Sequence, residues 1–77
     1  MFLSCGHYRG RIQTTTMKIC ETLADAWAHA LKQDNERSRK YMNARIWQFD
    51  AAGGKPKLLR PEYIQNQLGL PNVWKYL

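Results

Sequence analysis

Apolar side chains recur at spacings of three and four residues between positions 17 and 34, the strongest periodic pattern in the chain. The stripe consists of Cys20, Leu23, Ala24, Trp27 and Leu31. Such spacing places side chains along one face of an α-helix. Thr16 suits the N-cap of a helix that begins at Met17. We therefore predict an amphipathic helix over about 17–34, with Trp27 in the core.

The pattern changes from helical to strand-like near residue 44. Residues 44–49 are rich in β-branched and aromatic side chains, which is typical of a strand. A Gly-Gly pair and a proline in 50–56 predict a turn, so that 57–60 forms the return strand of a hairpin. Pro61 suits the first turn of a helix, and Gly69 suits its end. A short helix is therefore predicted over about 61–69.

Residues 1–16 lack a regular apolar pattern and are rich in Gly, Ser, Thr and Arg. Their threonines favour extended structure. We predict a leader that is either flexible or an edge strand, and that contributes little to stability. An internal start at Met17 is a further alternative. The rest of the chain, 17–77, is predicted to be a single small globular domain.

Together these elements predict an α+β fold. One dominant amphipathic helix (about 17–34) packs on a small antiparallel hairpin sheet (about 44–60), and a short C-terminal helix (about 61–69) follows. The length of 77 residues allows one domain with a small core. An all-helical domain is the alternative, if the stretch 41–49 continues the first helix.

The net charge of +6 changes the picture, because it is concentrated in the middle of the chain. Concentrated positive charge suits an anionic partner, either nucleic acid or an acidic protein surface, although it can also be a solvated face. The candidate nucleic-acid-binding residues are Arg37, Arg39, Lys40, Arg45, Lys55, Lys57 and Arg60.

Three aromatic residues are candidates for protein binding, namely Trp47, Trp74 and Tyr76. In a strand, Arg45, Trp47 and Phe49 point to one face. Trp47 then either stacks on nucleotide bases or fills the core, and the core is favoured because a small domain needs its large side chains inside. Trp74 and Tyr76 either fold back onto the domain, which we favour, or insert into a partner.

The sequence offers little material for catalysis or for metal binding. Asp25 and His29 share a helix face, but an exposed ion pair explains that spacing more simply than a catalytic dyad. The candidate zinc ligands are Cys5, His7, Cys20 and His29. They lack the paired short spacing of a structural zinc site. We predict no catalytic residue, no metal and no cofactor.

Other classes are excluded by length and by spacing. Residues 61–70 have the pattern of a first helix and its turn glycine, but the chain that remains is too short for a recognition helix. No apolar run approaches the roughly 20 residues that span a membrane. Two cysteines are too few for a disulfide-stapled domain, which favours a cytoplasmic location.

Two functions remain, both without catalysis. The first is a nucleic-acid-binding or regulatory module that uses the basic segment, and its binding should depend steeply on salt. The alternative is a small adaptor or inhibitor that binds another protein through its aromatic surface, as a monomer or as a homodimer. That alternative predicts an exposed hydrophobic patch and little dependence on salt.

Overall fold

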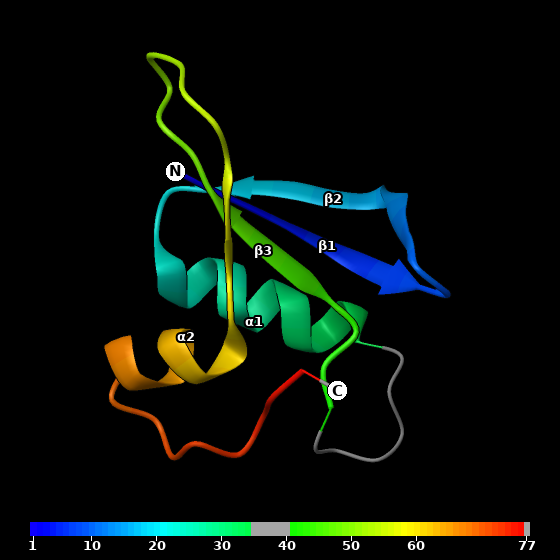
Figure 1. Cartoon of the computed structure of the whole chain (residues 1–77), viewed down its shortest axis with the longest axis vertical. Coiled ribbons are helices and arrows are strands. Elements are labelled where there is room, and N and C mark those ends of the chain that lie inside the picture. Colours follow the sequence, from blue (N-terminus) through cyan, green and yellow to red (C-terminus); the bar gives the residue numbers. More distant parts are fainter. Residues whose placement is uncertain (35–40, 77) are drawn as a thin grey trace.

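A single antiparallel sheet organises the protein, with the first helix against one of its faces and the second helix at the end of the last strand (Figure 1). The computed structural model describes residues 1–34 and 41–76. Its elements are β1 (Phe2–Tyr8), β2 (Arg11–Cys20), α1 (Leu23–Gln33), β3 (Arg45–Gln48), β4 (Lys57–Leu59) and α2 (Pro61–Gln67). The strands lie in the order β2-β1-β3-β4. The predicted α+β class and the antiparallel hairpin of β3 and β4 are thus confirmed.

The first strand, β1, is an interior strand, paired with β2 on one side and with β3 on the other. The sequence predicted a loose leader or an edge strand over 1–16. Of the two strands that begin in this range, β2 lies at an edge of the sheet and β1 does not. The reason is that Ser4, Cys5 and Gly6 are the buried residues of β1. Ser4 and Gly6 face the helix side, where their small size lets α1 approach closely, and Cys5 lies on the other side, opposite residues 14–17 of β2. None of the three produces a hydrophobic pattern in the sequence.

The predicted helix start at Met17 is wrong, because α1 begins at Leu23 and residues 17–20 belong to β2. Thr22, not Thr16, caps the helix, and its Oγ1 accepts a hydrogen bond of 3.1 Å from the Asp25 amide. Threonines and Ile19 favour extended backbone. The helix has 11 residues and is not clearly dominant. Its predicted core residue Trp27 is confirmed as buried.

A bulge interrupts the pairing of β2 with β1. Ser4 pairs with Lys18, whereas Gly6 pairs with Gln13, so residues 14–17 of β2 lie opposite Cys5 alone. The Thr16 hydroxyl secures the bulge, because it accepts from the Gly6 amide at 2.7 Å and donates to the Gln13 carbonyl at 2.6 Å. As a result, Ile12 before the bulge faces the same side of the sheet as Ile19 after it.

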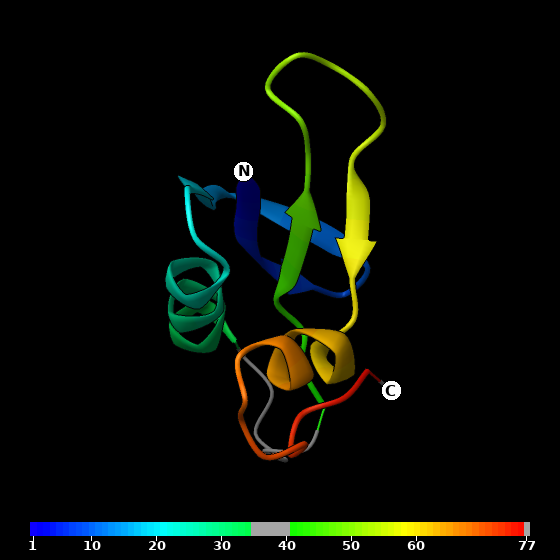
Figure 2. The same ribbon diagram turned by 90° about the vertical axis from the view of Figure 1, so that its left-hand side faces the viewer.

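Buried residues from both helices meet the sheet in one core. Trp27 and Ala30 of α1 and Ile64 of α2 pack with Ile46 of β3 and Leu59 of β4. Between β3 and β4 the chain extends away from the body as a loop of residues 49–56, which we call the finger (Figure 2). Two glycines in the finger adopt positive φ angles of 118° and 104°, which explains the Gly-Gly pair in the turn.

The C-terminal segment after α2 folds back onto it and does not form a further helix. Gln65, which is 1% exposed, holds it in place. Its Oε1 accepts from the amides of Val73 and Trp74, both at 2.9 Å, and its Nε2 donates to the Trp74 carbonyl at 2.7 Å. Trp74 and Tyr76 pack against the core, which confirms the predicted fold-back. Gly69, with a φ of 68°, follows α2 as predicted.

Deleting residues 1–16 should abolish folding. The deletion removes β1, the strand that connects β2 to β3 and that carries the surface under α1. We expect the remaining 17–77 fragment to lose its cooperative thermal transition, as followed by circular dichroism. A fragment that melts within a few degrees of the full chain would contradict the interior position of β1.

Replacing Gln65 by leucine should destabilise the protein by about 2–4 kcal/mol, because two backbone amides of the C-terminal segment lose their acceptor. Gln67→Leu is the matched control, because Gln67 is exposed on the same helix and should change stability by less than about 0.5 kcal/mol. Urea unfolding of both variants measures the difference. Equal midpoints would show that Gln65 does not hold the segment.

Candidate binding surface

A row of apolar residues crosses the sheet on the side away from the helices. Strand pairing places Ile19, Leu3, Trp47 and Leu58 next to one another in that order. Directly paired residues point to the same side of a sheet, and their neighbours Ile46 and Leu59 point into the core. The row therefore lies on the opposite side, which we call the open face. No element in 1–34 or 41–76 covers it, and Ile19 is 58% exposed.

The open face contains a shallow groove of about 540 Å³. The sheet lines it with Leu3, Ile12, Met17, Ile19 and Trp47. The finger adds Phe49, Asp50, Gly54 and Pro56. The bulge in β2 brings Ile12 to the same face as Met17 and Ile19. A local irregularity of the backbone thus makes the apolar surface continuous across four strands.

The groove is almost uncharged. Among its lining residues only Asp50 carries a charge, and one of its carboxylate oxygens accepts a 2.9 Å hydrogen bond from the Ala52 amide in the finger. Lys18 and Lys57 are paired with Ser4 and Gln48, so they project toward the helix side. Lys18 and Lys57 therefore do not reach the open face.

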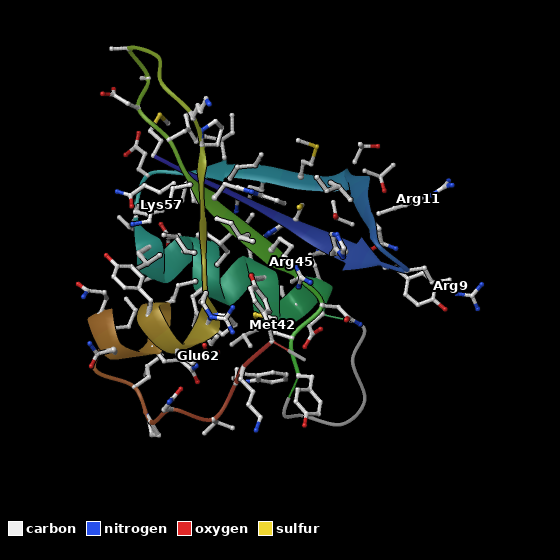
Figure 3. All side chains as sticks on the ribbon, viewed as in Figure 1. Arg9, Arg11, Met42, Arg45, Lys57 and Glu62 are labelled. Carbon is white, nitrogen blue, oxygen red and sulfur yellow. The ribbon has the colours of Figure 1, made fainter. Side chains whose placement is uncertain are left out.

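The predicted cationic residues do not form one patch among those that the structure describes. Arg37, Arg39 and Lys40 lie outside the described residues. Lys55 and Lys57 are exposed on the finger and on β4. Figure 3 shows Lys57 near one end of the sheet, and Arg9 and Arg11 near the other.

The other two predicted cations, Arg45 and Arg60, have structural partners. Nη1 of Arg45 donates to the carbonyls of Met42 at 3.0 Å and of Asn43 at 2.7 Å. The guanidinium of Arg45 also lies 4.2 Å from the centre of the Tyr76 ring. Arg60 forms a 2.9 Å ion pair with Glu62. The contact of Arg45 with Tyr76 helps to fix the C-terminal segment, and the ion pair offsets part of the charge of Arg60, whose side chain is 62% exposed.

The three predicted protein-binding aromatics have separate positions. Trp47 lies in the groove of the open face, half-buried, which differs from the core position that the sequence favoured. Tyr76 donates from its hydroxyl to the Leu59 carbonyl at 3.1 Å, and burial raises the pKa of this phenol. Trp74 packs against the core. Trp47 is therefore the aromatic of the three that lies in the groove.

His29 and Ser4 form a polar pair under α1. His29 Nδ1 lies 2.8 Å from the Ser4 hydroxyl oxygen. Desolvation, together with the nearby Lys18 and Lys32, lowers the pKa of His29, so the ring is neutral at pH 7. Ser4 is fully buried, so its hydroxyl is closed to substrates, and the histidine satisfies a buried polar group. In the described ranges, no three metal-ligating side chains gather, and no helix is long and apolar enough to cross a membrane.

Sequence reasoning missed five residues of the open face, namely Leu3, Ile12, Met17, Ile19 and Leu58. The available signal was the alternation of Met17 and Ile19 with polar residues, which is typical of a half-buried strand. The bulge hides the relation of Ile12 to this pattern, because it changes the parity of the positions that face outward. No family model matches the chain, and no curated protein or solved structure matches it significantly.

Proposed function

We propose that the protein is a non-enzymatic binding module that docks a partner protein through its open face. The observation that carries this proposal is the uncovered, nearly uncharged row from Ile19 to Leu58. Apolar surface gains roughly 25 cal/mol per Å² when it is removed from water. A sheet whose second face is apolar and uncovered is therefore suited to association with another surface.

The chemistry of the groove favours a protein partner over a nucleic acid. Surfaces that bind single strands place cations beside their aromatic rings, because the phosphates must be neutralised. Here Trp47 is surrounded by aliphatic side chains, and the charged residue at the groove is the acidic Asp50. Protein interfaces have the opposite character, with charged residues depleted from their cores and Trp and Met enriched.

Nucleic-acid binding is a second candidate, with a different surface. It is supported by the net charge of +6 and by two exposed cations of the finger and β4, Lys55 and Lys57. Neither lysine forms an ion pair with another described residue. This candidate would use the finger and not the groove, so the two proposals can be separated by mutation.

A cytoplasmic location fits either candidate. Cys5 and Cys20 are both buried and unbridged. Free thiols are typical of proteins from reducing compartments, where disulfides are rare. We therefore propose a cytoplasmic location for the binding.

Changing Ile19 to lysine should abolish docking, because a charge would then line the apolar groove and lose its water in the interface. Val73→Lys is the matched control, since Val73 is 56% exposed, close to the 58% of Ile19, but lies in the C-terminal segment. Tagged wild type and both variants are used to isolate partners from the native host, with quantitative mass spectrometry. A partner retained by wild type and by Val73→Lys should be absent with Ile19→Lys. Equal recovery with all three baits would contradict docking at the open face.

The second candidate predicts affinity for DNA or RNA that falls steeply with salt. Replacing Lys55 and Lys57 together by alanine should reduce the slope of log affinity against log salt by about 1 for each phosphate that is no longer neutralised. Fluorescence anisotropy with single- and double-stranded oligonucleotides measures this slope. Absence of binding at low salt would reject nucleic acid and leave the protein partner.

A further inference from the structure

We propose that the occupant of the open face is a second copy of this chain. The inference rests on the proposed function of that face and names its partner. Two copies would stack their open faces about 10 Å apart, as the sheets of a β-sandwich do. Each sheet would then be covered on both sides, by its own helices and by the other sheet. A two-fold axis near Leu3 and Trp47 makes one patch serve both copies.

The distribution of charge is the first argument for a second copy. Lys18 and Lys57 project to the helix side, so stacking two open faces keeps these cations of a +6 chain outside the interface. Arg45 starts at an open-face position, but its guanidinium is directed to backbone carbonyls and to the Tyr76 ring. Burial, with Arg45 nearby, lowers the pKa of His7, so that ring is neutral at pH 7.

A neutral face discriminates between partners. An acidic protein surface would find no complementary charge on the open face, and the attraction of the net +6 would draw it to the helix side instead. A second open face presents the same apolar, nearly uncharged surface. Apart from Asp50 at the finger, its groove has no charge that would lose its water without gaining a partner.

The size of the face is the second argument. Strands lie about 4.8 Å apart and rise about 3.4 Å per residue, so four strands with their flanks give a face of roughly 500 Å². Two copies would bury on the order of 1,000 Å² in total, near the lower limit of specific interfaces. The dimer should therefore be weak and sensitive to concentration. Trp47, next to Leu3 and Leu58 in the row, is the expected anchor.

Edge-to-edge pairing of two sheets is a less suitable route to a dimer. The outer edge of β2 is interrupted by the bulge at 14–17, a feature that blocks continuous pairing with another strand. The opposite edge, β4, has only three residues. Neither edge offers a long flat strand, whereas the open face extends across all four.

Analytical ultracentrifugation of the full-length chain tests the inference directly. Wild type should shift from monomer to dimer between about 1 μM and about 1 mM, the range of weak association. Raising the salt should preserve or strengthen the dimer, because it screens repulsion between two positively charged chains and leaves the apolar interface intact. Ile19→Lys and Leu58→Lys, at two different strands of the face, should each weaken dimerisation at least tenfold, and Val73→Lys should match wild type.

A measurement on wild type alone makes the test independent of how well the variants fold. A soluble paramagnetic probe should broaden the methyl NMR signals of Ile19 in dilute protein, where the face is exposed. In concentrated protein the dimer should cover Ile19, and the broadening should disappear. The methyl signals of Val73 should remain broadened at both concentrations. Thermal melts of the three variants establish which of them are folded and can be compared in the ultracentrifuge.

The outcomes separate this inference from the proposed function. A wild type that stays monomeric throughout overturns the second copy, and a different host protein that is absent with Ile19→Lys would then still support docking at the open face. A dimer that is unaffected by both face variants, with Ile19 methyls still accessible, also overturns the inference, because it would form through another surface. If host partners too are insensitive to Ile19→Lys, the proposed function fails as well.

Discussion

The two-sided pairing of β1 is the constraint on which the rest of the structure depends. Residues 2–4 pair both with the end of β2 and with β3. One short segment therefore closes a short loop to β2 and a much longer loop to β3. The N-terminal amine adds to this ladder by donating to the Phe49 carbonyl at 3.1 Å. Closing such loops costs conformational entropy, and the hydrophobic core on one side of the sheet must offset it. The row on the open face exists because this pairing brings four strands into register.

The two sides of the sheet are stabilised differently. On the helix side, small residues of β1 let α1 approach closely, and Ser4 finds its hydrogen bond in His29. At the C-terminal end, Gln65 supplies donors and an acceptor to a segment without regular structure. Polar groups buried in this way must be satisfied, so they fix one arrangement of the chain. The open face has no such polar connections, and its apolar side chains are free for a partner.

Much of the second half of the chain could be predicted from sequence, because its signals are local. A helix start favours proline, as at Pro61 of α2. Backbone with positive φ favours glycine, as at Gly69 and in the finger. Each of these signals depends only on the local conformation of the chain. Trp27 was identified as core because it lies in a helical stripe, even though the stripe was extended too far toward the N-terminus. The predicted cationic residues were chosen by their charge and their position in the sequence. Neither shows which cations have partners within the fold, as Arg45 has in two backbone carbonyls.

The first half could not be predicted, because its structure is set by pairing between distant residues. The environment of β1 is set partly by β3, whose paired residues lie forty or more positions away, and the bulge conceals the alternation of β2. That bulge has a consequence for how the chain can change over evolution. Removing residues 14–16 would join the two halves of the ladder into one, with Met17 opposite Cys5 and every other pair unchanged. Because the extra residues lie on an outer edge, β2 can absorb insertions and deletions there, whereas β1, enclosed on both sides, cannot.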